Sequence, residues 1–239
     1  FISSYAMFSP GRNWEQIRTT ICYNNQSVKI AGAHSGVSVG PDGATHQAIE
    51  DIAITRVIPN MVVIAPCDSI EAKKATIAAA KYKGPVYIRF TREKTPVMTT
   101  ESTPFEIGQA EIFREGKDIT LIGCGPLVYE ALKAAEELAK EGIEVEVVNN
   151  HTIKPMDKET ILKSVKKTGC VVTIEEHQAA GGMGSAVSEI LSQNYPVPME
   201  IIGVKDRFGE SGEPAELLEK FGLTAKNIIA AAKRVLKRK

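Results

Sequence analysis

Runs of β-branched and aliphatic residues alternate with amphipathic runs along most of this chain. This alternation restricts the possible folds more than any other feature of the sequence. The first third contains, in order, a helix-like run at 12–23, a strand-like run at 28–33, a helix-like run at 46–57, a strand-like run at 61–65, a helix-like run at 68–82 and a strand-like run at 86–90. Parallel strands need crossover connections, which the intervening helices supply. The pattern therefore predicts a βαβαβ arrangement with a parallel sheet.

The segment 91–104 interrupts this alternation, because it is rich in threonine, proline and charge. Beyond it the alternation resumes, with strand-like runs at 105–113, 119–122, 144–148, 170–174 and 199–204 and helix-like runs at 127–141, from 157, at 182–193 and at 225–236. A chain of 239 residues also exceeds the usual size of one domain. We therefore predict an α/β protein with two consecutive domains, each a mostly parallel sheet flanked by helices, over 1–95 and 105–239, with a linker at 96–104.

Charge and cysteine content narrow the possible partners and location. The 29 basic residues balance the 29 acidic ones, so no overall field favours nucleic acid or an anionic membrane. The basic tail at 233–239 is typical of a solvated helix end. No apolar run reaches the roughly 18 residues of a membrane span. No signal peptide is visible, although a start at Phe1 without methionine indicates an upstream segment. The widely spaced cysteines predict reduced core thiols in a cytoplasmic protein.

The densest group of chemically active side chains lies in residues 34–47, between an expected strand and an expected helix. This loop contains His34, Asp42 and His46 with glycines between them. Open α/β sheets bind ligands in such strand-to-helix loops. Glycines let backbone N–H groups approach a ligand, and the three side chains can donate, accept or transfer protons. A purely structural turn is the alternative. A metal site is disfavoured, because the spacing does not match a zinc site.

An ordered series of motifs runs through nearly the whole chain. The motifs are Phe1–Phe8, Trp14–Arg18, His34–Val37, Gly40–Gln47, Ile58–Met61, Tyr87–Arg92, Thr152–Asp157, Gly181–Gly184 and Gly212–Leu218. One glycine motif would be weak evidence, whereas this ordered set is specific, and it resembles the transketolase family. The resemblance implies a thiamin diphosphate-binding fold followed by a transketolase C-terminal domain.

The resemblance also implies a reaction and a set of site residues. It implies an enzyme of carbohydrate metabolism, in the pentose phosphate pathway, that uses thiamine diphosphate to move a two-carbon ketol unit from a ketose phosphate to an aldose phosphate. In the family the cofactor supplies the electron sink. Phe8 matches the aromatic residue that stacks against its aminopyrimidine ring, and Tyr5 matches an aromatic residue of the same pocket. His34 and His46 match imidazoles that contact substrate oxygens near the reacting bond, with proton transfer expected from either.

Two further residues match the family's contacts to sugar phosphates. Asp42 matches the acid that hydrogen-bonds a hydroxyl of the donor sugar and so reads its configuration. Arg92 matches the arginine that binds the phosphate, for which its planar fork of N–H donors is suited. Arg89 on the preceding strand is the alternative phosphate ligand. A salt bridge in the linker is the structural alternative for Arg92.

Important parts of the family pattern are absent from the chain. The glutamate that activates the cofactor lies, in the family, upstream of the segment that matches Phe1–Phe8. The diphosphate and Mg²⁺ (or Ca²⁺) are held there by another domain, whose motifs neither Gly40–Gly43 nor the pairs Asn24–Asn25 and Asn149–Asn150 reproduce. The resemblance thus implies the C-terminal part of a split or truncated transketolase. Such a part would be inactive alone, would form at least a homodimer and would need an N-terminal diphosphate-binding subunit or domain.

Other interpretations remain open. The segment Glu175–Gly184 favours a structural or dimer-interface role, with an anion at a helix N-terminus as the alternative. A 1-deoxy-xylulose-5-phosphate synthase or the beta subunit of a 2-oxo acid dehydrogenase would share the architecture, although Ile88–Arg92 and Glu50–Asp51 resemble transketolase more closely. A non-catalytic assembly module is the alternative of another class.

Overall fold

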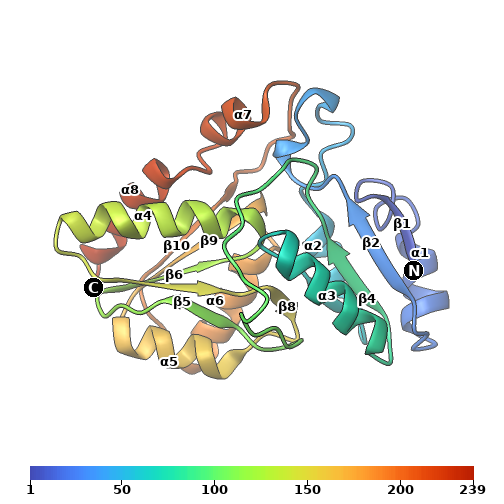
Figure 1. The fold of residues 1–239 in the computed structure, drawn as a ribbon, viewed down its shortest axis with the longest axis horizontal. Coiled ribbons are helices and arrows are strands. Elements are labelled where there is room, and N and C mark those ends of the chain that lie inside the picture. Colours follow the sequence, from blue (N-terminus) through green and yellow to red (C-terminus); the bar gives the residue numbers. More distant parts are fainter.

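Two five-stranded sheets with helices around them make up the chain (Figure 1). The computed structural model describes residues 1–239. The elements are β1 (Ile2–Tyr5), α1 (Trp14–Gln16) with a π-helical continuation (Ile17–Cys22), β2 (Lys29–Ala33), a 3₁₀ helix (Val37–Asp42), α2 (Asp51–Arg56), β3 (Val62–Ile64), α3 (Ser69–Lys81), β4 (Val86–Arg89), β5 (Glu111–Arg114), β6 (Ile119–Gly123), a second 3₁₀ helix (Gly125–Leu127), α4 (Val128–Lys140), β7 (Val145–Asn149), β8 (Thr152–Lys154), α5 (Lys158–Thr168), β9 (Val171–Gln178), α6 (Met183–Asn194), β10 (Met199–Val204), α7 (Pro214–Lys220) and α8 (Ala225–Leu236).

The first sheet has the strand order β1-β2-β4-β3-β8. Its first four strands are parallel, as the alternation of strands and helices predicts. Every residue of β3 and β4 is buried, which explains why their sequences, apart from Arg89 at the end of β4, are apolar without alternation. Because the strands are parallel, their carboxyl ends lie at the same edge of the sheet. Loops that follow β1, β2 and β4 can therefore meet there.

One strand crosses the predicted domain boundary. β8 lies within the predicted second domain, yet it pairs antiparallel with β3 of the first sheet. The predicted linker is also anchored, since the Asp68 carboxylate at the start of α3 accepts hydrogen bonds from the backbone N–H groups of Met98 (2.7 Å) and Thr99 (2.6 Å). Thr99 is accordingly buried. The connection between the two predicted domains is thus held against the first sheet.

The second sheet has the order β10-β9-β6-β7-β5, and only β5 runs antiparallel to its neighbour. Helices α4 and α8 lie on one face of this sheet, and α5 and α6 lie on the other (Figure 1). The fold class predicted from the sequence is confirmed: both sheets are mostly parallel and both are flanked by helices.

The two sheets share apolar cores. One cluster contains Ile30 and Val63 of the first sheet together with Ile122 and Val148 of the second. Another joins Val37, which lies in the His34–Gln47 loop, and Ile49, which follows it, to the side chains of the second sheet. All four cysteines are buried and unpaired, as expected for core thiols. Burial of these apolar side chains therefore holds the His34–Gln47 loop at the junction of the two sheets.

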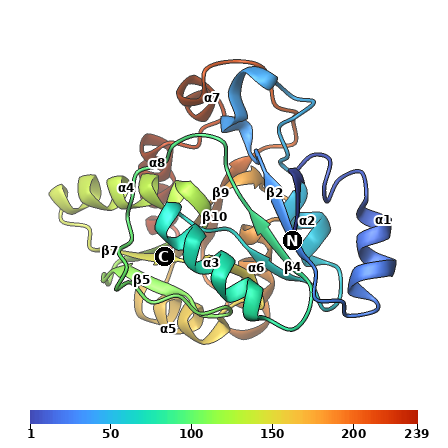
Figure 2. The same ribbon diagram turned by 45° about the vertical axis from the view of Figure 1, so that its right-hand side comes forward.

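Several predicted boundaries are wrong in detail. The helix predicted at 46–57 begins at Asp51, because Ala48 still forms a parallel bridge with Ser35 and its carbonyl accepts the N–H of Gly36 at 2.8 Å. The residues treated as a plain glycine loop include the 3₁₀ helix Val37–Asp42. The strand predicted at 105–113 begins at Glu111. Helix α7 was not predicted. It packs against the 3₁₀ helix Val37–Asp42, and Figure 2 shows the two segments side by side.

Candidate active site

The predicted site residues follow the carboxyl ends of neighbouring strands in the first sheet. Tyr5 is the last residue of β1 and pairs in register with Ala33, the last residue of β2. His34 follows Ala33 directly, and Arg92 lies just beyond the end of β4. Strands β1, β2 and β4 are adjacent, so these residues share one edge of the sheet. This is the edge at which parallel α/β sheets bind ligands.

Four rings gather at this edge. The Tyr5 ring stacks on the His34 imidazole with centroids 4.2 Å apart and planes 6° from parallel. Phe8 lies 6.0 Å from Tyr5, and His46 meets the Phe8 ring edge-on at 5.4 Å. All four side chains are only partly buried. The cluster therefore presents flat apolar surface and imidazole nitrogens together, which suits a ligand with a heteroaromatic ring.

The two histidines are held in defined orientations. His34 adopts a left-handed backbone conformation with φ of 56°, which is uncommon for a residue with a side chain and often marks a functional site. Its Nδ1 is buried and has no hydrogen-bond partner within the chain. The Nδ1 of His46 lies 2.9 Å from the Thr45 hydroxyl. Nε2 of each imidazole has no hydrogen-bond partner within the chain and is not among the buried atoms, so it is the ring nitrogen that a ligand could reach.

Asp42 and Arg92 form a pair at the same edge. The Arg92 guanidinium donates through Nη1 to the carbonyl of Val39 at 2.9 Å and to the Asp42 carboxylate at 3.1 Å. The Arg92 side chain is 37% exposed and the Asp42 side chain 29% exposed. An exposed ion pair of this kind stabilises a fold by about 1 kcal/mol at most. Both groups therefore remain available to a charged ligand.

Gln47 holds the conformation of the His34–Gln47 loop, a structural role that no sequence pattern indicated. Its buried side-chain amide donates to the carbonyls of Val37 (3.0 Å), Gly40 (3.3 Å) and Glu210 (2.9 Å). Glu210 belongs to the connection between β10 and α7, so this amide ties the loop to the second domain. A Cβ at Gly209 would collide with the Gln47 side chain, which explains the glycine there.

Arg89, the alternative phosphate ligand, is buried and hydrogen-bonds only to groups of the protein itself. Its side chain is 3% exposed, and its Nε donates to the Asp51 carboxylate at 2.8 Å. Its Nη2 donates to the carbonyls of Ala48 (3.2 Å) and Glu176 (2.7 Å). Tyr87 donates to the same carboxylate at 2.7 Å, and burial together with Asp51 raises the pKa of its hydroxyl. Arg89 thus belongs to a buried network between the two sheets.

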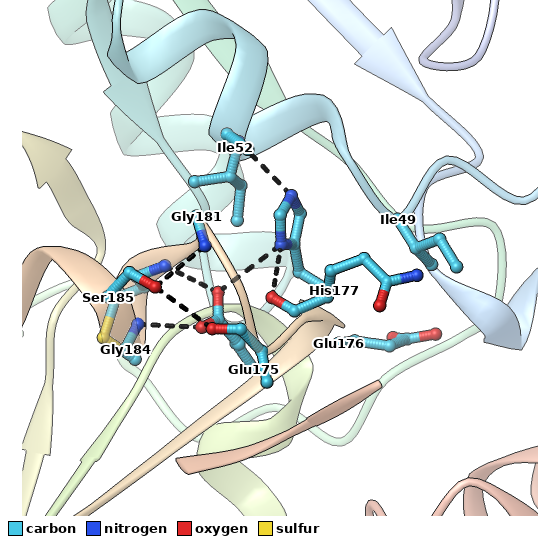
Figure 3. Close-up of polar contacts among 12 residues, drawn as sticks. Ile49, Ile52, Glu175, Glu176, His177, Gly181, Gly184 and Ser185 are labelled. Atoms are coloured by element: carbon cyan, nitrogen blue, oxygen red, sulfur yellow. Dashed lines mark hydrogen bonds and ion pairs between the residues drawn. The ribbon is translucent and has the colours of Figure 1, made fainter. Parts of the chain in front are cut away.

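The segment Glu175–Gly184 contacts the first domain and caps a helix (Figure 3). The Glu175 carboxylate accepts from the N–H groups of Met183 (2.7 Å) and Gly184 (2.8 Å), so the anion at this helix N-terminus is the protein's own. Burial raises the pKa of Glu175. His177 accepts the N–H of Ala53 in α2 through Nε2 at 3.3 Å, and its Nδ1 lies 2.8 Å from the carbonyl of Gln178. Figure 3 shows Glu176 pointing away from this group.

The chain has few features for a diphosphate or a metal ion. No group of three or more His, Cys, Asp or Glu side chains is arranged to hold a metal ion. Asn149 and Asn150 are fully buried near the junction of the two sheets, and Asn149 donates to Glu71 at 2.7 Å. No helix is both long and apolar enough to cross a membrane.

Comparison with known proteins identifies two families in the chain. Residues 1–98 match the transketolase pyrimidine binding domain, and residues 108–228 match the transketolase C-terminal domain. The 6-deoxy-6-sulfo-D-fructose transketolase subunit of Clostridium sp. (strain MSTE9) is 44% identical over 239 residues, which cover 100% of this chain and 74% of that protein. The 1-deoxy-D-xylulose-5-phosphate synthase of Desulfotalea psychrophila is 42% identical over 234 residues, covering 95% of this chain and 36% of that enzyme.

A solved structure is similar over the whole fold. It is described as a split gene transketolase in the form of an inactive beta4 tetramer, and it matches this chain with a TM-score of 0.94 and 46% sequence identity. The match covers 99% of this chain and 76% of that chain. Fold and site together define a two-domain α/β protein with a ring-lined site at the edge of its pyrimidine-binding sheet. The chain belongs to the transketolase family.

Proposed function

We propose that this chain is the C-terminal subunit or part of a thiamine diphosphate-dependent transketolase. It transfers a two-carbon ketol unit from a ketose phosphate to an aldose phosphate. The observation that carries the proposal is the meeting of the Tyr5, Phe8, His34 and His46 rings beside β1 and β2, in a chain of the transketolase family. Asp42 lies in the loop that follows β2 and Arg92 lies just beyond the end of β4, and the pair adds polar contacts for a sugar.

The rings fit the aminopyrimidine half of the cofactor. Tyr5 and Phe8 are only partly buried, and Nε2 of His34, which has no partner within the chain, can hydrogen-bond to a bound group. When bound, thiamine diphosphate supplies the electron sink for breaking and forming the carbon–carbon bond. The Thr45 contact at Nδ1 of His46 leaves its Nε2 to accept or donate a proton at a substrate oxygen.

Arg92 and Asp42 bind the donor sugar in this proposal. Arg92 presents a planar set of N–H donors to a phosphate, and an incoming phosphate would compete with Asp42 for them. Asp42 would then accept a hydrogen bond from a sugar hydroxyl. One relative is named for a sulfonated rather than a phosphorylated sugar, and a sulfonate would also satisfy an arginine. We favour phosphate, and assays with both donors distinguish the two classes.

The chain needs a partner to hold the rest of the cofactor. It contains no cluster of metal ligands, so the diphosphate and its Mg²⁺ (or Ca²⁺) belong on an N-terminal subunit or domain. The solved relative is described as an inactive tetramer of beta chains. We propose that this chain is likewise inactive alone, associates with itself at least as a homodimer, and acts in the cytoplasm with its N-terminal partner. Nucleic acid and membranes are not among its partners.

A 1-deoxy-xylulose-5-phosphate synthase is the second candidate, because one such synthase is 42% identical. A relative of the 2-oxo acid dehydrogenase beta subunit and a non-catalytic assembly module are weaker candidates. Product analysis with pyruvate as the donor separates the first two candidates from transketolase. A transketolase yields no pyruvate-derived product and instead exchanges ketol units between pentose phosphates.

The test is to combine the chain with its N-terminal diphosphate-binding partner and measure ketol transfer together with thiamine diphosphate affinity. We expect activity only in the mixture. Phe8→Ala should weaken cofactor binding roughly threefold to tenfold, as expected for loss of one ring contact. Phe208→Ala is the matched control, since the Phe208 side chain is 79% exposed and lies outside the ring cluster. An inactive mixture would refute the transketolase proposal, and equal cofactor affinity in both variants would refute the role of Phe8.

A further inference from the structure

Glu176 of the second domain contacts the His34–Gln47 loop directly. Its Oε1 accepts the backbone N–H of Ser38 at 2.5 Å, and the residue is 2% exposed. From this contact we propose that Glu176 is a positioning residue for the donor site: it holds the 3₁₀ helix Val37–Asp42 so that Asp42 and Arg92 face the substrate. The inference rests on the proposed function, because it assigns a task to Glu176 in that same site.

The fit between Glu176 and the loop is close on both sides. A Cβ at Gly36 would collide with the Glu176 carboxylate, and Gly36 also has a φ of 86°, which glycine adopts without strain. The loop backbone can therefore approach the carboxylate only because residue 36 lacks a side chain. A bond to a carboxylate is stronger than a neutral one, and burial protects it from competing water.

Glu176 is itself fixed by the first sheet. Arg89 donates to its carbonyl at 2.7 Å, and Gln178, two residues further along β9, donates its N–H to the carbonyl of Ile49 at 2.8 Å. Arg89 is in turn paired with Asp51. The carboxylate that holds the loop therefore has a defined position relative to β4, the strand that leads to Arg92.

The short 3₁₀ helix Val37–Asp42 connects the Glu176 contact at Ser38 with the two groups that Arg92 contacts. Ser38 is followed by Val39, whose carbonyl accepts from Nη1 of Arg92 at 2.9 Å. The same helix ends at Asp42, which accepts from the same nitrogen at 3.1 Å. Glu176 at one end and Arg92 at the other thus bracket this helix. A shift of Ser38 would displace the adjacent carbonyl of Val39, and Arg92 links that carbonyl to Asp42 across a kink at Gly40, where φ is 79°.

Packing alone does not hold this side of the helix. A cavity of about 280 Å³ is lined by Ser38 and Glu176 together with residues of the segment after β4, of α4 and of α7, among them Thr95, Tyr129 and Pro214. Empty space beside Ser38 supplies no contacts that could replace a lost hydrogen bond. The Glu176 carboxylate therefore restrains the start of the helix from the second domain, alongside the Gln47 amide that donates to the carbonyl of Val37.

Amide hydrogen exchange of the isolated chain tests the structural half of the inference without the cofactor or the partner. Glu176→Ala should accelerate exchange across residues 37–42 at least roughly tenfold, as expected for loss of a bond to a charged group. Glu175→Gln is the matched control, because Glu175 is equally buried but contacts Met183 and Gly184 instead. It should affect the start of α6 and leave residues 37–42 unchanged. Unchanged exchange at 37–42 in Glu176→Ala would overturn the inference.

Kinetics of the assembled complex test the positioning half. Asp42 and Arg92 bind parts of the donor that do not react, so Glu176→Ala should raise KM for the ketose phosphate roughly tenfold while kcat changes less than about threefold. Glu176→Gln keeps an oxygen that can accept from Ser38 and should restore most of the KM. Equal losses in Glu176→Ala and Glu175→Gln, or a fall in kcat alone, would overturn the positioning role. An inactive unaltered complex would instead refute the proposed function, and the exchange experiment would still decide the role of Glu176.

Discussion

Two arginines at the end of the same strand have opposite environments. Arg89 and its partner Asp51 have side chains 3% and 1% exposed, whereas Arg92 and its partner Asp42 are 37% and 29% exposed. Arg89 also donates to carbonyls on both sides of the domain junction. Arg92 contacts only the loop beside it and its neighbour Glu93. The difference shows which charge serves the fold and which remains free for a ligand.

The same contrast follows from elementary electrostatics. Removing one member of a buried ion pair leaves an unpaired charge without water, which costs about 3–5 kcal/mol. Removing one member of an exposed pair costs about 1 kcal/mol or less, because water solvates the remaining charge. Stability and substrate binding should therefore respond in opposite order to the same substitution at the two arginines.

The largest expected effect comes from Arg89→Met. It leaves Asp51 buried and unpaired and removes the bond to the Glu176 carbonyl. We expect a loss of about 3–5 kcal/mol in the free energy of unfolding, measured by denaturant titration. Arg18→Met, at an exposed position of the first domain, is the control and should change stability by less than about 0.5 kcal/mol. A loss below about 1 kcal/mol in Arg89→Met would contradict the structural role of this buried pair.

The histidines extend the comparison between buried and accessible groups. His46 lies in the partly exposed ring cluster, whereas His151 is fully buried beneath the Phe105 ring at 4.3 Å. Burial lowers the pKa of His151 from 6.5 to about 4. Between these pH values the unfolded chain binds the proton and the folded chain does not. This histidine therefore stabilises the fold above pH 6.5 and loses that contribution as the pH falls toward 4.

The second prediction is that His151→Phe reduces this acid sensitivity. The substitution keeps an aromatic ring against Phe105 and removes the titrating group. The shift from 6.5 to about 4 corresponds to about 3 kcal/mol of stability lost on acidification, which the variant should retain. Glu71 acts in the opposite direction, since burial raises its pKa to about 6 and so favours the folded state as the pH falls to 4.5. Unfolding titrations from pH 7 to pH 4 measure the difference, and parallel curves for both proteins would contradict the prediction.

The elements of the fold were largely predictable where they follow from the local hydrophobic pattern. They were less predictable where they depend on strand pairing between distant segments. Helix α8 spans 225–236 as its amphipathic period predicts. Strand β8 has only three residues, and its sequence cannot show that it pairs with β3 across the domain boundary. The helix predicted from position 46 starts later because Ala48 bridges to Ser35, a contact set by the sheet.

For the candidate site as well, the sequence indicates residue types, whereas contacts between distant segments come only from the structure. The residue types in the loop and the family motifs indicated Asp42, Arg92 and the four rings as candidates. Their meeting depends on the parallel register of β1 and β2, which places Tyr5 opposite Ala33. Arg89 is the last residue of β4, whereas Arg92 lies beyond the end of that strand, so we propose Arg92 rather than Arg89 as the phosphate ligand. Glu176 was seen as part of a structural segment, and no local pattern could show that its carboxylate reaches Ser38.

Arg92→Met makes the same substitution on the exposed side of the comparison, and we expect it to change stability far less than Arg89→Met. The free energy of unfolding should fall by less than about 1 kcal/mol, because the pair with Asp42 is exposed. In the assembled complex KM for a phosphorylated ketose should nevertheless rise roughly tenfold or more, since Arg92 supplies charged donors to the phosphate. A ketose without phosphate is the control donor, and its KM should hardly change because the lost contact was to the phosphate. An equal rise for both donors would mean that Arg92 shapes the loop rather than binding the phosphate, and a large loss of stability would remove the distinction between the two arginines.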